Sequence, residues 1–205
     1  MHRGKLIVIE GIDGTGKSTQ AQRLADWLRG RGHDVVQSRE PTDGTWGRKL
    51  RESAATGRLS REEELEWFLN DRREHVETLI LPALQAGKTV VLDRYYFSTM
   101  AYQGARGLDP REIRVSNESF APRPDLLLIL DLAVPAALMR IGVRGDTANE
   151  FEQCENLERC RAIFLTLEGE PFTRIIDSNG STAEVTAEIL RTVAGFLGEP
   201  PFPHR

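Results

Sequence analysis

The feature that most constrains this chain is a glycine-rich stretch with the sequence Gly11-Ile12-Asp13-Gly14-Thr15-Gly16-Lys17-Ser18-Thr19. Two of its glycines are separated by four residues, and the second is followed by Lys-Ser, which is the spacing of a phosphate-binding loop, or P-loop. Glycines let the backbone N–H groups of such a loop close on a polyphosphate. We therefore expect residues 11–19 to hold a nucleoside triphosphate, with Lys17 at its terminal phosphates and Ser18 as a ligand of Mg²⁺.

The residues on either side of this loop agree with that interpretation. The apolar run at 6–9 predicts a buried parallel strand over residues 5–9, and apolar residues after Lys17 recur at helical spacing until Gly30 and Gly32. A helix that begins at Lys17 would add the partial positive charge of its N-terminus to the phosphate site. The pattern thus predicts the strand, loop and helix that a P-loop requires.

Short apolar runs alternate with longer amphipathic segments along the rest of the chain, which is typical of an α/β fold. We expect strands at residues 5–9, 34–38, 89–92, 126–130 and 173–177. The fourth of these runs is the most apolar and is expected to be central or nearly central. Capping boxes at Ser60/Glu63 and Ser181/Glu184 each begin a helix, and Pro82 is expected to kink or divide the first of them. Further helices are expected near residues 48–55, 98–103, 135–140 and 149–167, and another short helix is expected to start at Asp109-Pro110.

Length and composition narrow the class of protein. The 205 residues suit one domain spanning residues 1–205, and the formal net charge of −4 argues against nucleic acid as a partner. No stretch approaches the roughly 18 apolar residues of a membrane span, and no signal-peptide pattern opens the chain. We therefore expect no membrane partner and a cytoplasmic location. Cys154 and Cys160 are interpreted as free thiols with no disulfide or metal role.

Three further segments stand in register with the P-loop: Arg39-Glu40-Pro41, residues 68–72 and residues 93–104, which begin Asp93-Arg94-Tyr95. With them, the chain resembles the bacterial thymidylate kinases over nearly its whole length. The resemblance implies a three-layer P-loop nucleoside-monophosphate kinase fold, in which helices flank a five-stranded parallel sheet, and it implies a homodimer. It also implies the substrates ATP and dTMP: the γ-phosphoryl group of Mg-ATP would move to dTMP, giving dTDP and ADP for dTTP synthesis.

The resemblance assigns roles to charged residues around the phosphates. Lys17 would hold the donor phosphates and Arg94 would bridge donor and acceptor, a task that suits its planar fork of N–H donors. Arg51 is a weaker candidate for the acceptor phosphate. Asp13 is expected to contact the deoxyribose 3′-hydroxyl or to help hold the metal and phosphates. Asp93, at a strand end, resembles the aspartate that holds Mg²⁺, with a helix N-cap as the alternative.

The resemblance also assigns residues to the nucleoside. Phe68 would stack on thymine, with packing in the core as its alternative, and Arg72, one turn later on the same helix face, would donate to thymine O4. Gln103 would read the imide edge of the base, with Thr99 nearby. Tyr102 would crowd the 2′ position of the sugar and so favour deoxyribose. These residues come from two separate segments, so the prediction requires the fold to bring them together.

The expected lid, at about residues 140–151, departs from the family pattern. Loop residues 12–15 contain no basic side chain, so an arginine of the lid is expected to cover the transferring phosphoryl group, and Arg140 and Arg144 are the candidates. Glu150 stands where the family often has arginine. Beyond the last helix, the prolines of residues 199–205 predict a tail.

Two other functions remain open from the sequence. A deoxynucleoside kinase would share the P-loop but would need a catalytic carboxylate for its neutral hydroxyl acceptor, and Glu40 is the candidate. A catalytically impaired nucleotide-binding protein is the other alternative. At the level of single residues, Arg94 could form a structural ion pair with a carboxylate such as Glu40. His75 has no evident second metal ligand and is interpreted as bonding along its own helix face.

Overall fold

The computed structural model describes residues 4–57, 59–143 and 150–200, and its centre is a parallel sheet in the order β2-β3-β1-β4-β5. The strands are β1 (Lys5–Glu10), β2 (Val35–Arg39), β3 (Thr89–Asp93), β4 (Leu126–Asp131) and β5 (Thr173–Asp177). The predicted α/β fold with five parallel strands is confirmed. β4 lies directly beside the central strand β1, as its apolar sequence predicted.

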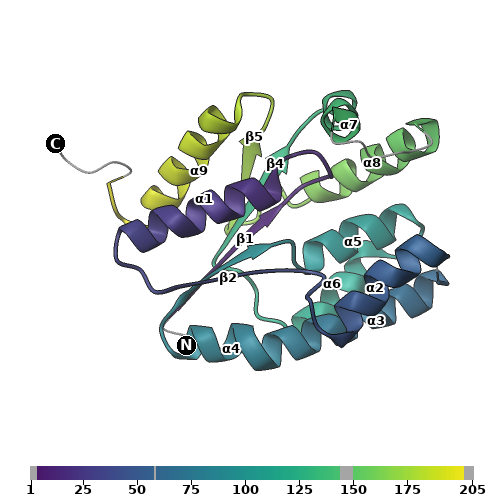
Figure 1. Ribbon diagram of the computed structural model, residues 1–205, viewed down its shortest axis with the longest axis horizontal. Coiled ribbons are helices and arrows are strands. Elements are labelled where there is room, and N and C mark those ends of the chain that lie inside the picture. Colours follow the sequence, from purple (N-terminus) through teal and green to yellow (C-terminus); the bar gives the residue numbers. More distant parts are fainter. Residues whose placement is uncertain (1–3, 58, 144–149, 201–205) are drawn as a thin grey trace.

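Helices cover both faces of this sheet (Figure 1). One face carries α1 (Lys17–Gly30) and α9 (Thr182–Leu197), which pack against each other. The other helices lie over the opposite face or extend beyond it: α2 (Thr45–Thr56), α3 (Arg61–His75), the π-helix η1 (Val76–Ile80), α4 (Leu81–Gln85), α5 (Tyr96–Ala105), α6 (Pro110–Glu118), α7 (Val134–Val143) and α8 (Glu150–Leu165). Among the described residues, no helix has the length and apolar character needed to cross a membrane.

Successive residues of β1 enter two separate hydrophobic cores. Leu6 and Val8 pack in the core that includes residues of α4, α5 and α8, whereas Ile7 and Ile9 pack in the core formed with α1 and α9. All four side chains are buried because a parallel strand covered on both faces has no solvent side. The apolar run that predicted this strand is therefore explained by its central place.

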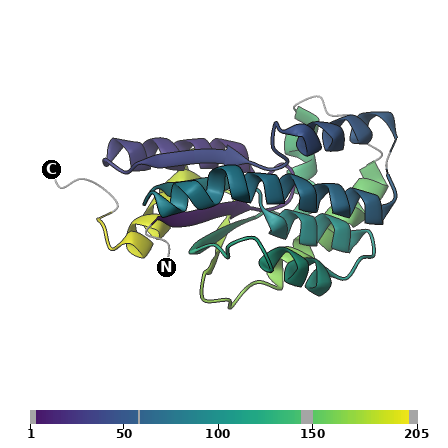
Figure 2. The same cartoon turned by 90° about the horizontal axis from the view of Figure 1, so that it is seen from below.

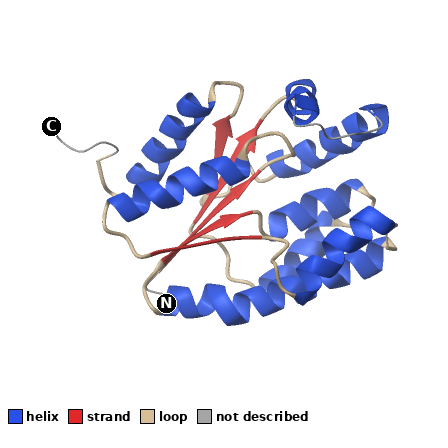
Figure 3. Ribbon diagram, in the orientation of Figure 1, coloured by secondary structure: helices blue, strands red, loops and turns tan. Residues whose placement is uncertain are grey.

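The carboxyl ends of the strands define one functional end of the molecule. Their arrowheads point toward α5 and α8, which extend past the sheet (Figure 3). Figure 2, turned by 90°, shows α2, in dark blue, standing beyond the strands at the same end. Ligands of open α/β sheets bind outside the carboxyl ends of the strands, so this arrangement places a site between the P-loop and these helices.

The helix after Ser60 continues without a break through α3, η1 and α4. Ser60 caps it with Glu63, as predicted, and Pro82 lies in the first turn of α4. A proline cannot donate the usual backbone hydrogen bond, and here a π-helical turn, Val76–Ile80, precedes it. The expected effect of Pro82 thus takes the form of a local change in helix type.

Candidate active site

The P-loop passes from β1 into α1 close to the end of β4. Gly16 is the N-cap of α1 with φ of 90°, and no side chain of the described residues caps this helix, so its first N–H groups are available to an anion. Gly11 has φ of 142°, and a Cβ atom there would lie 2.5 Å from the backbone oxygen of Leu130. Only glycine allows the loop to run this close to β4.

Lys17 points into the P-loop. Its side chain is buried, its Nζ donates to the backbone oxygen of Ile12 at 2.8 Å, and Nζ lies 3.9 Å from Asp13 Oδ1. Burial, together with the positive charge of Arg94, lowers the pKa of Lys17 to about 8. A polyphosphate in the loop would favour the protonated amine by supplying the opposite charge.

Ser18 and Asp93 meet where α1 begins and β3 ends. The Ser18 hydroxyl donates to Asp93 Oδ2 at 2.5 Å, while the buried Oδ1 has no hydrogen-bond partner among the described residues. A hydroxyl, an unpartnered carboxylate oxygen and the phosphates of a nucleotide are the oxygen ligands that Mg²⁺ prefers. These residues therefore fit the metal. Tyr95, and not Asp93, is the N-cap of α5, so the N-cap alternative for Asp93 was wrong.

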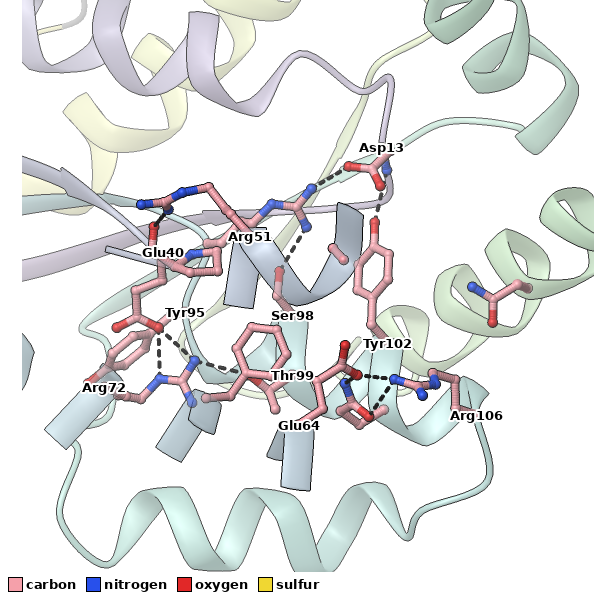
Figure 4. A pocket seen from close by; sticks show the side chains of 16 residues that line it. Asp13, Glu40, Arg51, Glu64, Arg72, Tyr95, Ser98, Thr99, Tyr102 and Arg106 are labelled. Carbon is pink, nitrogen blue, oxygen red and sulfur yellow. Dashed lines mark hydrogen bonds and ion pairs between the residues drawn. The ribbon is translucent and has the colours of Figure 1, made fainter. Parts of the chain in front are cut away.

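A cavity of about 540 Å³ opens beside the P-loop (Figure 4). Its lining includes the nine residues predicted to contact the acceptor nucleotide: Asp13, Glu40, Arg51, Phe68, Arg72, Arg94, Thr99, Tyr102 and Gln103. These residues come from the P-loop, from the segment after β2, and from α2, α3, α5 and the β3–α5 connection. The fold thus brings the predicted acceptor residues into one cavity, and their individual roles stay predictions.

Asp13 and Arg94 lie where this cavity meets the P-loop. Arg94 forms a close ion pair with Asp13 and also donates to Ser98 Oγ at 3.2 Å (Figure 4). The Tyr102 hydroxyl accepts from the backbone N–H of Asp13 at 3.1 Å. Although burial acts to raise it, the charges of Arg94 and Lys17 hold the pKa of Asp13 below its ordinary value. Arg94 therefore does form an ion pair with a carboxylate, that of Asp13 and not Glu40, and its role at the phosphates stays a prediction.

Arg72 and Phe68 lie on adjacent turns of α3 and line the same cavity. Phe68 is partly exposed there, as a ring that stacks on a ligand must be, whereas Arg72 is almost fully buried. Arg72 Nη2 donates to Thr99 Oγ1 at 3.0 Å, which joins α3 to α5. Arg51 lies at the rim, where its guanidinium donates to the backbone oxygen of Pro41 and pairs with Asp43.

Glu40 is committed to two partners. Its Oε2 accepts from Arg72 Nε at 2.8 Å, and its Oε1 lies 2.9 Å from His75 Nδ1. Although burial acts to raise it, the positive charge of Arg72 and the contact with His75 hold the pKa of Glu40 below its ordinary value. His75 also contacts Ser38 on β2, so the interpretation that it bonds along its own helix face was wrong.

Glu10 is a site residue that the sequence interpretation missed. This fully buried carboxylate, at the end of β1, accepts from the N–H groups of Tyr95 and Ser98 and from the Ser98 hydroxyl. It therefore caps α5, whose N-cap residue makes no side-chain cap of its own, and it fixes the segment that carries Arg94. The sequence did offer a signal for this role, because a glutamate ends an apolar run directly before the P-loop.

Glu64, Arg106 and Asn156 also line the cavity and were not predicted. Glu64 Oε2 accepts from Gln103 Nε2 at 2.6 Å and pairs with Arg106, as Figure 4 shows. Because a carboxylate only accepts, this contact sets which end of the Gln103 amide carries its NH₂ group. The signal was available in part, since Glu64 precedes Phe68 by four residues and so shares its helix face.

A second cavity, of about 310 Å³, adjoins the P-loop on the side of α9. It is lined by loop residues 14–16, by Arg140 and by the start of α9. Arg140 Nη2 donates to the backbone oxygens of Ser178 at 2.9 Å and Gly180 at 3.4 Å. Arg140 is thus absent from the lining of the acceptor cavity. Arg144 and residues 144–149 of the expected lid lie outside the described residues, as does most of the expected tail.

These features define a P-loop phosphotransferase for small molecules: the P-loop has a buried lysine, a Ser–Asp pair lies beside it, and arginines line the adjoining cavity. A family model described as thymidylate kinase matches residues 9–189. The chain is 53% identical over 196 residues to the thymidylate kinase of Xanthomonas campestris pv. campestris, covering 96% of this chain and 86% of that one. It is 53% identical over 192 residues to that of Akkermansia muciniphila, covering 94% and 92%. The chain belongs to the thymidylate kinase family.

Proposed function

We propose that this chain transfers the γ-phosphoryl group of Mg-ATP to dTMP, with dTDP and ADP as products. The observation that carries the proposal is the cavity that adjoins the P-loop and has Asp13 and Arg94 at the shared edge. One nucleotide in the loop and another in the cavity would meet at these two side chains. The relatives of this chain carry the name thymidylate kinase, which agrees with that substrate pair.

The chemistry of this transfer is dominated by charge. The acceptor is a phosphate oxygen that is already anionic, so the protein does not need a general base to remove a proton from it. It must instead bring two anions into line and stabilise the charge on the transferring group. Lys17 would hold the donor phosphates, and Arg94 would contact both phosphoryl groups with different N–H groups of one guanidinium.

Ser18 and Asp93 would hold Mg²⁺, together with oxygens of the donor phosphates and water. The metal would supply positive charge to the β- and γ-phosphate oxygens. Support comes from the buried Asp93 Oδ1, which has no partner among the described residues although a buried carboxylate oxygen ordinarily has one. In the described part of the chain, no cluster of three acidic, histidine or cysteine residues forms a metal cage, which suits a metal that arrives with a nucleotide.

The deoxynucleoside would lie between α3 and α5. Phe68 would stack on thymine, Arg72 would donate to O4, and Gln103 would face the imide edge with its amide set by Glu64. Asp13 would accept from the 3′-hydroxyl, and Tyr102 would exclude a 2′-hydroxyl. Each of these residues lines the same cavity, which supports their joint use by one ligand.

The environment of Glu40 argues against the deoxynucleoside kinase alternative. A base for a neutral hydroxyl group needs a carboxylate that can take a proton, and it must reach that hydroxyl. Glu40 is buried, bonded through both oxygens to Arg72 and His75, and held ionised by them. It is therefore better suited to orienting Arg72 than to removing a proton.

A coupled assay of ADP release tests the proposal. The chain is supplied with Mg-ATP and, in separate reactions, with dTMP, dUMP, thymidine, dCMP or AMP. Turnover with dTMP that exceeds turnover with thymidine, dCMP and AMP is expected. Turnover with thymidine alone would indicate a nucleoside kinase, and no turnover with any acceptor would indicate a nucleotide-binding protein.

We further propose a homodimer, which the family resemblance implies, and a cytoplasmic location, which was the expectation from the sequence. Sedimentation equilibrium of the purified chain tests the first of these, with twice the monomer mass of 23.0 kDa expected. A monomer at all concentrations would contradict it. Fractionation of the producing cells tests the second.

A further inference from the structure

A series of polar side-chain contacts runs from β2 to the acceptor cavity through His75. Ser38 Oγ lies 2.8 Å from His75 Nε2, and His75 Nδ1 lies 2.9 Å from Glu40 Oε1. Glu40 Oε2 in turn accepts from Arg72 Nε at 2.8 Å and forms an ion pair with Arg72 Nη2 at 2.6 Å. His75, Glu40 and Arg72 are each at most 5% exposed, so water offers little compensation if one contact is lost.

The position of one proton in this series of contacts follows from the chemistry of the two groups that share it. The Glu40 carboxylate can only accept, so Nδ1 of His75 carries a proton and donates it to Oε1. His75 therefore occupies one oxygen of Glu40 and leaves Oε2 to Arg72. As a result, Arg72 contacts a single carboxylate oxygen, by a hydrogen bond from Nε and an ion-pair contact of Nη2, instead of pairing with both oxygens in a parallel fork.

This one-oxygen contact leaves the rest of the Arg72 guanidinium to other partners. Nη2 also donates to Thr99 Oγ1 at 3.0 Å, and Nη1 donates to Asn117 Oδ1 at 2.6 Å. Asn117 Nδ2 donates to the backbone oxygen of Ile113, so the amide is held with its oxygen toward Arg72. Within the described residues, no acceptor takes the second N–H of Nη1, which leaves a donor for a ligand in the cavity.

We propose that His75 is a positioning residue for base recognition, because its Nδ1–H holds the Glu40 carboxylate in the orientation that directs the Arg72 guanidinium toward the acceptor cavity. Without that donor, Oε1 of Glu40 is buried and unpaired. The carboxylate then turns to pair with Arg72 through both oxygens, and the guanidinium moves away from Thr99 and from the ligand. This inference rests on the proposed function, in which Arg72 donates to O4 of thymine.

Two substitutions of similar size separate a positioning role from a packing role. The amide nitrogen of asparagine is attached at the same point as Nδ1 of histidine, so His75→Asn can keep the donor to Glu40. The amide of glutamine lies one atom further out, so His75→Gln reaches the Ser38 side and loses that donor. Both variants keep a polar side chain in the same place, and a thermal melt of each checks that it is folded.

The measurements are kcat and KM for dTMP, KM for ATP, and the ratio of kcat/KM for dTMP to that for dCMP, which carries an amino group in place of O4. His75→Gln is expected to raise the KM for dTMP about tenfold, the effect of losing one hydrogen bond to a charged group. The dTMP-to-dCMP ratio should fall, while kcat and the KM for ATP stay close to wild type. His75→Asn should restore the ratio.

The inference is overturned if His75→Gln keeps the wild-type KM and ratio, or if the two variants change alike. An Arg72→Met variant separates this failure from failure of the proposed function. A raised KM for dTMP in Arg72→Met, with an unchanged His75→Gln, leaves the base site standing and removes only the role of His75. An unchanged KM in Arg72→Met means that the proposed base site is itself wrong.

Discussion

Glu10→Gln is predicted to remove a loss of stability that sets in as the pH rises. The Glu10 carboxylate is fully buried and accepts from Tyr95 N at 2.7 Å, from Ser98 N at 2.9 Å and from Ser98 Oγ at 2.6 Å. A glutamine oxygen can accept the same backbone bonds, and its NH₂ group can donate to the Ser98 hydroxyl. The substitution therefore removes an ionisable group with little change of shape.

Burial raises the pKa of Glu10 from 4.5 to about 7, because the Ser98 hydrogen bond and the charge of Arg94 offset the cost of burial only in part. Between these pH values the folded protein binds more protons than the unfolded chain, so the free energy of unfolding falls as the pH rises through them. At about 1.4 kcal/mol for each pH unit, the ionised carboxylate lowers the stability of the fold by about 3 kcal/mol.

Urea unfolding followed by tryptophan fluorescence, from about pH 4.5 to about pH 7.5, measures this effect. The free energy of unfolding of the wild type minus that of Glu10→Gln should fall by about 3 kcal/mol across the range. This pH range stops short of the pKa of Lys17, which burial and the charge of Arg94 lower to about 8. An exposed Glu168→Gln control should show no such fall. A difference that stays constant, or that rises with pH, would refute the reasoning.

Three other substitutions test separate parts of the site. Gly14→Ala places a Cβ 2.6 Å from the backbone oxygen of Ala137 at φ of 89° and should lower the stability by about 2 kcal/mol, so an unchanged melting temperature would contradict it. Phe68→Ala should raise the KM for dTMP about tenfold or more, since base stacking on an aromatic ring contributes about 1–3 kcal/mol, and an equal rise in the KM for ATP would count against stacking. Arg144→Ala should depress kcat more than it weakens dTMP binding, because a lid arginine acts on transition-state charge, and an unchanged kcat would assign that role to Arg140 or another residue.

The strands and the first helix could be predicted because their signals are local. An apolar run followed by a P-loop and a capping box such as Ser181/Glu184 depend only on neighbouring residues. The start of α5 could not be predicted in this way, because its first N–H groups are bound by Glu10, 85 positions away from Tyr95. The helix accordingly begins at Tyr96, two residues before its expected start.

Nine residues that line the acceptor cavity could be predicted from the sequence, but the contacts among them could not. Phe68 and Arg72 share a helix face, and continuing the same spacing backwards reaches Glu64, which also lines the cavity. The partners of His75 and Arg72 depend on how α3 packs against β2 and α6, and no local pattern encodes that packing. For the same reason the bond of Arg140 to the β5–α9 connection could not be predicted.

Transfer of a radiolabel from the γ-phosphoryl group of ATP to dTMP tests the central claim most directly. With Mg²⁺ present, the wild-type chain is predicted to produce labelled dTDP. A folded Lys17→Ala variant is predicted to produce none, because the buried amine at the P-loop would no longer hold the donor phosphates. Labelled product from thymidine but not from dTMP, or full dTDP formation by Lys17→Ala, would contradict the account.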